Sequence, residues 1–247
     1  MKNKFFFTAG IVGMLSGVAS GATDGAEVDY GSDCSPYVTL RGGWLCGEYK
    51  VRDHWNFGDW NWKRSTESGW SYSAEAGIAC FEDRVFLGLE LGSFGEKVHD
   101  DLQCNPPEIF PELQMNNILV NGKIKHSFGA CNFTLKQDIG ERTFLYGGVG
   151  AGMVRAVADL HFTEIGIARG TGDDWSNSYS DHDAKWRFFG QTFGGIGWYL
   201  NDNWSLSAGY RLRYVPGDFR FHDDDGYGLS VKSNCLHAAE VGITYQF

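Results

Sequence analysis

The acidic residues of three segments are the first candidates for chemistry in this sequence. They stand at Asp173-Asp174, at Asp181 and Asp183, and at Asp223-Asp224-Asp225. Clustered carboxylates suit hard cations such as Ca²⁺ or Mg²⁺. The spacing of an EF-hand loop is absent, however, and ordinary solvated charge explains acidic loops of this kind. We therefore expect no metal site.

Two histidines in the same segments are each followed by an aspartate, at His182-Asp183 and at His222-Asp223. A histidine in a surface loop can act as a general base, as a lipid-modifying enzyme would require. No nucleophile motif accompanies either pair, and acidic loops often contain a histidine. We expect no catalytic residue, no cofactor and no enzyme activity. An enzyme acting on lipid A is the weakest of the alternatives kept open.

A second set of charged residues recurs at a spacing that is typical of β-strands. In the closing stretch, His237–Phe247, the apolar residues Val241 and Ile243 alternate with polar or small ones such as Glu240. Period two indicates a strand whose two faces meet different surroundings. The same pattern runs through the chain. Its polar faces carry Arg41, Glu75, Glu90, Lys123, Arg187, Arg211 and Glu240.

About eight segments show this alternation, and their connections are long and short in turn. Tight turns are expected at 82–84 and 201–203, and residues 129–142 form the weakest stretch, a turn with strand extensions. A meander with every second connection long has its long loops on one side, as in an up-and-down outer-membrane barrel. The expected strands are 34–48, 69–81, 85–98, 113–128, 143–157, 184–200, 204–215 and 237–247, with long loops at 51–68, 99–112, 159–183 and 216–234.

These patterns predict an all-β protein, a closed eight-stranded antiparallel up-and-down transmembrane β-barrel. The interior of such a barrel is only wide enough for side chains, so the charges of the polar faces would meet there. A buried charge needs a partner, and we expect an ion network that plugs the lumen. A narrow channel for small solutes is the main alternative. A soluble lipocalin-like barrel is a further one.

Composition and the first residues fit an exported β-protein. The chain has 34 glycines, 5 prolines and 15% aromatic residues, which suits many strands in close contact. Its net charge of −10 argues against nucleic acid as a partner. Lys2 and Lys4 before the apolar run Phe5–Val18 predict a signal peptide over residues 1–22. We expect a periplasmic lead-in at 23–33, one barrel domain at 34–247 and no second domain.

Aromatic residues near the strand ends predict two belts at the membrane interfaces. In the first long loop, Trp55, Trp60 and Trp62 are able to stack on a sugar, although a loop packed on itself or on lipopolysaccharide is the simpler interpretation. The belt residues are Trp198, Trp204, Tyr245 and Phe247 at one end, and Trp44, Trp186 and Tyr214 at the other.

The 6 cysteines suggest disulfides in an exported chain. The predicted topology places Cys34, Cys80 and Cys131 on the periplasmic side and Cys46, Cys104 and Cys235 on the outer side. Because a bridge cannot cross the membrane, we expect at most two intramolecular disulfides. Two pairs would join adjacent strands on matching faces, namely Cys34–Cys80 and Cys46–Cys235.

From Cys34 to Phe247 the chain resembles the small bacterial outer-membrane β-barrel family of the opacity proteins and the OmpA transmembrane domain. The resemblance lies in the strand pattern, the glycine-rich hairpin at 193–204 and the terminal Tyr245-Gln246-Phe247. It implies a Gram-negative outer membrane, contacts with its lipids and lipopolysaccharide, and recognition of the C-terminal strand by the barrel-assembly machinery. It also implies a structural or adhesion-like role, with an extracellular ligand at the loops. The peptidoglycan-binding domain of OmpA has no counterpart here.

Overall fold

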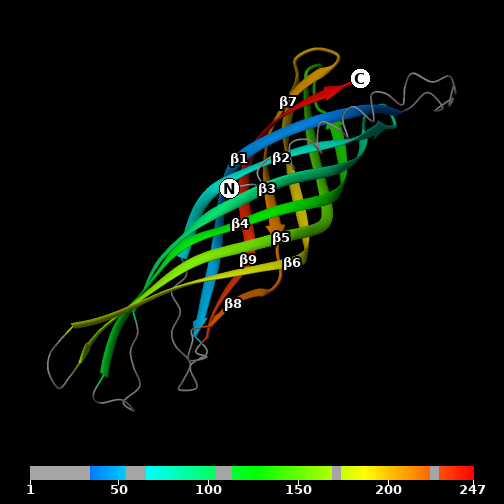
Figure 1. Ribbon diagram of the computed structural model, residues 1–247. Coiled ribbons are helices and arrows are strands. Elements are labelled where there is room, and N and C mark those ends of the chain that lie inside the picture. The colour runs from blue at the N-terminus through cyan, green and yellow to red at the C-terminus, as the bar shows by residue number, and fades with distance from the viewer. Residues whose placement is uncertain (1–33, 54–64, 104–112, 169–173, 223–227) are drawn as a thin grey trace, which may run out of the picture. The chain divides into compact units, whose positions relative to one another are not determined.

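The strands form a closed barrel within the unit Cys34–Phe247. The computed structural model describes residues 34–53, 65–103, 113–168, 174–222 and 228–247. The sheet order is β1-β2-β3-β4-β5-β6-β7-β9-β8, and pairing of β1 with β9 closes it (Figure 1). The strands are β1 (Cys34–Asp53), β2 (Ser65–Cys80), β3 (Val85–Gln103), β4 (Leu113–Asp138), β5 (Thr143–Ala168), β6 (Asp174–Tyr199), β7 (Trp204–Tyr214), β8 (Asp218–His222) and β9 (Gly228–Gln246).

The barrel has eight strands around its circumference although nine are numbered. β7 and β8 pair one after the other with the same strand, β9, and so occupy one position in the wall. Between them lie Pro216, which has no backbone N–H to give to a ladder, and Gly217, whose φ is +113°. All pairings are antiparallel. The predicted closed eight-stranded antiparallel barrel is therefore confirmed.

The alternation of the sequence becomes an inner and an outer wall. On β2, Ser71 and Glu75 are buried, whereas Trp70 and Tyr72 are 66% and 65% exposed. On this strand, large apolar side chains point away from the barrel and polar ones into it, the reverse of a soluble protein. In the described part of the chain, no helix has the length and apolarity needed to cross a membrane.

Three short turns lie at one end of the barrel, which we call the turn side; the opposite end is the loop side. In the turn after β2, Phe81, Glu82 and Asp83 have φ values of 58°, 54° and 62°. In the turn after β6, the Asn201 side-chain oxygen accepts hydrogen bonds from the backbone N–H groups of Asn203 and Trp204, at 3.0 and 2.8 Å. This side-chain acceptor fixes a tight reversal, as asparagine commonly does in turns.

Residues 129–142 are a turn with a strand extension, as expected: β4 runs to Asp138 and the turn is confined to 139–142. The expected length of the loop-side strands was wrong. Residues 159–183, expected as an acidic loop, belong mostly to β5 and β6, which pair as far as Ile167 and Asp174. Polar residues are compatible with a strand that stands in water, so the lack of apolar alternation did not mark a loop there. Figure 1 shows β4, β5 and β6 continuing on the loop side.

The seam between β1 and β9 closes the wall along the length of β1, and further contacts hold its turn-side end. The hydroxyl oxygens of Thr39 and Thr244 lie 2.8 Å apart across it. The backbone N–H of Phe247 donates to the carbonyl of Pro36 at 3.0 Å. Closure leaves no strand edge at this seam, as a sheet in lipid requires.

Candidate functional site

The turn-side half of the lumen holds a network of ion pairs. Arg41 lies 2.8 Å from Glu75 and 3.8 Å from Glu90. Arg211 bridges two carboxylates, with Nη1 2.8 Å from Glu90 and Nε 2.8 Å from Glu240. These five residues were predicted to share the lumen, and the structure brings them into direct contact.

Further residues, not predicted from the sequence as part of the network, complete it. Arg213 lies 2.8 Å from Glu240 and adds a third guanidinium to the three carboxylates, so the formal charges balance. The Asn132 amide donates to Glu75 and Glu90 at 2.6 and 2.8 Å. The alternation of the strands could have identified them, because Asn132 and Arg213 each stand between two outward-facing residues.

Two further side chains hold the carboxylates in place. The Gln191 amide donates to Glu90 and to the Asn132 side-chain oxygen, each at 2.8 Å. The Tyr37 hydroxyl donates to Glu75 at 2.5 Å. A buried ion pair offsets its desolvation only when further hydrogen bonds satisfy the charged groups, which is the role of these amides and this phenol.

An apolar layer closes the lumen on the loop side of the network. Its aromatic members are Phe94, Phe128 and Phe189. The ring centroids of Phe94 and Phe128 lie 5.6 Å apart, and those of Phe128 and Phe189 lie 5.4 Å apart. The guanidinium of Arg213 lies over the rings of Phe94 and Phe128 at 5.1 and 5.3 Å, which joins the two layers. The remaining members are Leu45, Ala130, Val154, Val215, Leu236 and Ala238, all buried.

Beyond the apolar layer lie three more polar side chains. Glu96 and His126 are fully buried, with His126 Nε2 3.9 Å from Glu96 Oε1. The His126 ring stacks on Phe94 at 4.4 Å. Arg187, which we expected in the charge network, lies on this side of the layer, next to Gly217. The lumen charges are therefore divided into two groups by the apolar layer.

One residue that was predicted to face the lumen faces outward instead. Lys123 is exposed on the outer face of β4, and its neighbour Ile124 is buried inside the barrel. The prediction failed because it assigned apolar residues to the lipid at every level of the strand. At the loop side, the interior needs apolar side chains and the outer wall meets water.

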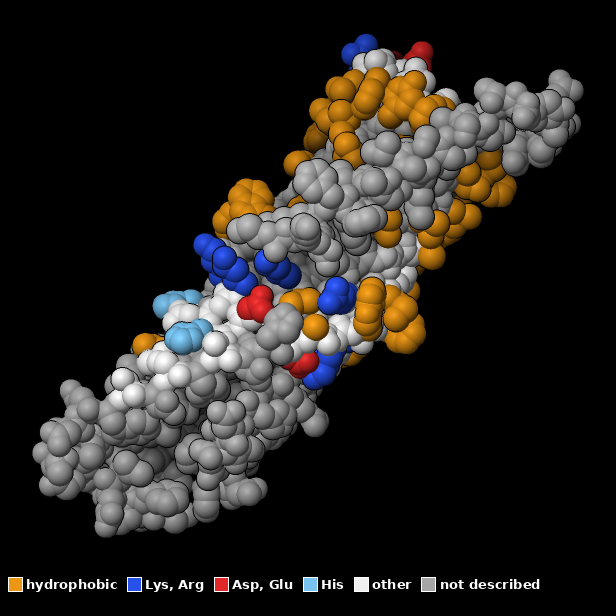
Figure 2. Space-filling view, viewed as in Figure 1, with side chains coloured by type: hydrophobic (Ala, Val, Ile, Leu, Met, Phe, Trp, Pro, Cys, Tyr) orange, Lys and Arg blue, Asp and Glu red, His pale blue; other side chains and the backbone are white. Residues whose placement is uncertain are grey.

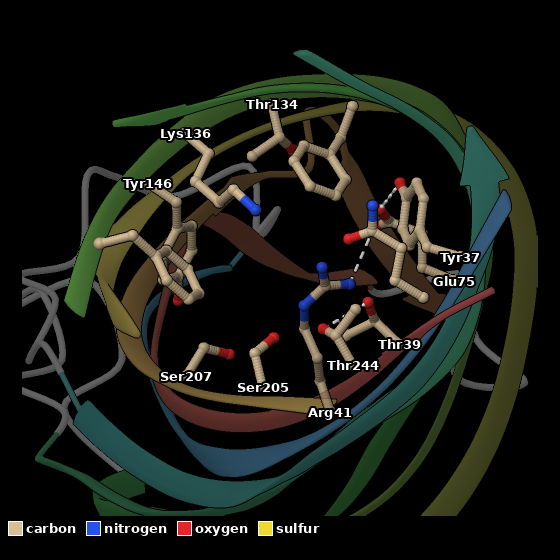
Figure 3. Close-up of a pocket in the computed structure, with 13 residues that line it drawn as sticks. Tyr37, Thr39, Arg41, Glu75, Thr134, Lys136, Tyr146, Ser205, Ser207 and Thr244 are labelled. Carbon is tan, nitrogen blue, oxygen red and sulfur yellow. Dashed lines mark hydrogen bonds and ion pairs between the residues drawn. The ribbon is translucent and has the colours of Figure 1, made fainter. Parts of the chain in front are cut away.

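A small cavity opens on the turn side of the network (Figure 3). Its volume is about 60 Å³. Arg41 and Lys136 point into it, and hydroxyl groups line its lower wall in this view. The Lys136 ammonium lies over the rings of Phe86, Phe144 and Tyr199 at 4.9, 5.2 and 5.0 Å. Of the charged residues of the network, Arg41 and Glu75 line the cavity.

The predicted belt aromatics lie on the outer wall. At the turn side, the rings of Trp204 and Tyr245 lie 4.8 Å apart, as do those of Tyr245 and Phe247. At the loop side, Trp44 contacts Trp70, which the prediction omitted, at 4.9 Å. Between them the wall is apolar, as Figure 2 shows in orange. The other belt residues, Trp186, Trp198 and Tyr214, are 65%, 42% and 52% exposed.

One of the two expected disulfides is present. Cys34 and Cys80 are opposite each other on β1 and β2 and are bonded. Cys46 and Cys235 are free thiols. Both belong to the outer face, but Cys46 lies opposite His237. A diagonal offset of two residues separates Cα atoms by about 7–8 Å, beyond the usual reach of a disulfide.

Several expectations concern parts of the chain that lie outside the described residues. These are the signal peptide at 1–22, the lead-in at 23–33, Trp55, Trp60, Trp62, Cys104, Asp173 and Asp223-Asp224-Asp225. The strands include Asp174, Asp181, His182 and His222, but their side chains are not described.

Solved structures resemble this fold, whereas no family model and no curated protein match the chain. Neisserial surface protein A is 16% identical over 87% of this chain and 99% of its own, with a TM-score of 0.47. OprG from Pseudomonas aeruginosa is 13% identical over 86% of this chain and 97% of its own, with a TM-score of 0.45. Ail of Yersinia pestis, solved with the heparin analogue sucrose octasulfate, is 14% identical over 86% and 99%, with a TM-score of 0.32. At these identities the likeness concerns the fold, a small closed β-barrel, and of the three OprG is described as an outer membrane protein.

Proposed function

We propose that this protein is a surface-interaction barrel of the bacterial outer membrane whose lumen is closed to solutes. One observation carries the proposal: a charge network and an apolar layer lie one above the other inside the barrel. Glu90, Phe94 and Leu45 are each 1% exposed or less. A passage for solutes would need wetted side chains at this level. The barrel then acts as a rigid support for the segments at its loop side.

The outer wall supports the location. Its apolar side chains between two aromatic belts suit lipid and would be costly in water. Export through a signal peptide at 1–22, with a short lead-in at 23–33, belongs to the proposal. Insertion would use the barrel-assembly machinery, with Tyr245 and Phe247 of the closing strand as the residues read.

The proposed interaction is with an extracellular ligand, or with lipopolysaccharide, at the loop side. β4, β5 and β6 are 26 residues each, and about 10 residues suffice for a strand to cross a bilayer. Much of their length is therefore available outside the lipid. Binding residues are often carried on segments that a rigid scaffold positions in this way.

Conductance in planar bilayers tests the closed lumen. The wild-type barrel should remain silent, and stable openings would favour the alternative of a narrow channel. A triple variant, F94A/F128A/F189A, should conduct if the apolar layer is the seal. The matched control removes rings from the lipid face, in F133A/F188A, and should remain silent.

The enzyme alternative is tested separately. Hydrolysis or acyl transfer on lipid A that is lost in H182A or H222A would overturn the proposal of a non-enzymatic barrel. Equal lipid A composition in membranes with and without the protein supports it.

A further inference from the structure

Four basic side chains gather on the outer wall of β3, β4 and β5. We call Lys97, Lys123, Lys125 and Arg155 the cationic patch. All four are exposed. In Figure 2, basic side chains lie between the orange wall and the loop side. The patch is notable in a chain whose net charge is −10.

The sheet register places these residues next to one another. Lys97 is directly opposite Lys123, and Arg155 is opposite Ser127. Neighbouring strands are about 4.8 Å apart, and successive residues on one face are about 6.6 Å apart. The four cations therefore cover an area of roughly 10 by 15 Å.

The same register places the patch beside aromatic residues of the loop-side belt. Trp70 and Lys125 are both opposite Gly95, and Trp186 is opposite Arg155. Tryptophan is enriched where a membrane protein passes from hydrocarbon to headgroups. The cationic patch thus begins in the rows of the loop-side aromatic belt and continues one row beyond it.

Fold stability does not explain the patch. Like charges that are directly opposite on antiparallel strands destabilise a sheet, and Lys97 and Lys123 stand in this relation. Asp159 is the one acidic residue opposite a member, Lys123. Among the described residues, no ion pair joins any of the four cations to a carboxylate. A counter-charge from outside the chain would remove this repulsion.

We propose that the cationic patch binds the phosphate groups of a glycolipid headgroup in the outer leaflet. This inference rests on the proposed membrane location. The position of the patch favours a lipid over a soluble polyanion, because its lower rows share the belt with Trp70 and Trp186 and adjoin the apolar wall. A ligand there would place its acyl chains on that wall and its phosphates on the lysines. Arginine and lysine side chains are the usual partners of phosphate.

The test compares lipid retention by two variants, one that removes the four cations of the patch and one that removes two exposed cations at the turn side. The barrel is reconstituted in phosphatidylcholine vesicles containing phosphorylated or dephosphorylated lipid A, extracted, and analysed for bound lipid A by mass spectrometry. In K97Q/K123Q/K125Q/R155Q, retention of the phosphorylated lipid should fall at least about tenfold, since each cation near an anionic surface contributes appreciably. The control R84Q/R142Q alters exposed cations at the turn side and should retain lipid as the wild type does.

Three results would overturn the inference. They are equal retention by the patch variant, equal retention of the dephosphorylated lipid by the wild type, and retention of neither lipid. A sulfated oligosaccharide that binds the detergent-solubilised wild type, and loses binding in the patch variant while lipid retention is unchanged, would assign the patch to a soluble polyanion instead. Gel migration without boiling checks that each variant is folded. The patch variant should show no channel openings in planar bilayers. A failure of the closed-lumen proposal is therefore distinguishable from a failure of the lipid-binding proposal.

Discussion

The two ends of strand β4 have opposite polarity. At the turn side, Asn132 and Thr134 point into the barrel and are 4% and 8% exposed. Their neighbours Phe133 and Leu135 point outward and are 41% and 53% exposed. This half is polar inside and apolar outside, as expected of a wall in lipid.

At the loop side the arrangement is reversed. Ile124 and Phe128 are inside, 0% and 3% exposed, while Lys123 and Lys125 are outside. This half is built like a soluble β-protein, with an apolar interior and a charged surface. One strand is therefore built for two solvents, and its polarity changes near the loop-side aromatic belt.

The largest expected effect comes from breaking the charge network of the turn-side half. Arg211→Met leaves Glu90 and Glu240 without their shared guanidinium, and removing one partner of a buried pair costs about 3–5 kcal/mol. Urea unfolding in detergent, followed by the gel shift of the folded barrel, measures this loss. The control is Arg84→Met, whose pair with Glu82 at 3.5 Å is exposed, so the loss should stay below about 1 kcal/mol. Equal losses would show that the network is not a buried one.

Next in size is the apolar layer of the loop-side half. Phe128→Ala removes a buried ring between Phe94 and Phe189 and should lower the free energy of unfolding by about 3 kcal/mol. Phe133→Ala removes the same ring from the outer wall and should cost clearly less. If both variants lose the same stability, the loop-side lumen is not a packed core.

The position of the solvent boundary is tested on β3. Leu89→Lys places a charge in the apolar wall and should cost about 2–3 kcal/mol in lipid. Lys97→Leu, on the same face of the same strand, should change stability by less than about 0.5 kcal/mol. Unfolding in vesicles gives both values, and similar costs would place both residues in the same solvent.

The smallest expected effect concerns a single hydrogen bond of the turn-side lumen. Thr39→Val removes the contact with Thr244 across the β1–β9 seam and should cost about 1 kcal/mol. Ser127→Ala, on the exposed outer face of β4, should be neutral in the same urea titration. A neutral Thr39→Val would mean that the seam does not depend on this pair.

Much of the fold was predictable from local pattern. Alternation on β2 and β3 gave the correct walls for Trp70, Glu75 and Glu90, because one face meets lipid and the other a polar interior. The sequence predicted that Arg41 and Glu75 share the lumen, but not that they pair with each other. Strand ends beyond the lipid were missed at 159–183, since a strand in water needs no apolar face.

Local sequence pattern specified the strand period, the tight turns at 82–84 and 201–203, and the closed barrel that a two-faced wall demands. Contacts across the closed sheet were needed to establish which wall Lys123 occupies, which carboxylate each arginine meets, and that Cys46 lies opposite His237. The physical reason is that period two is a local property of the chain, whereas the solvent at each level and the register between strands depend on contacts made across the closed sheet.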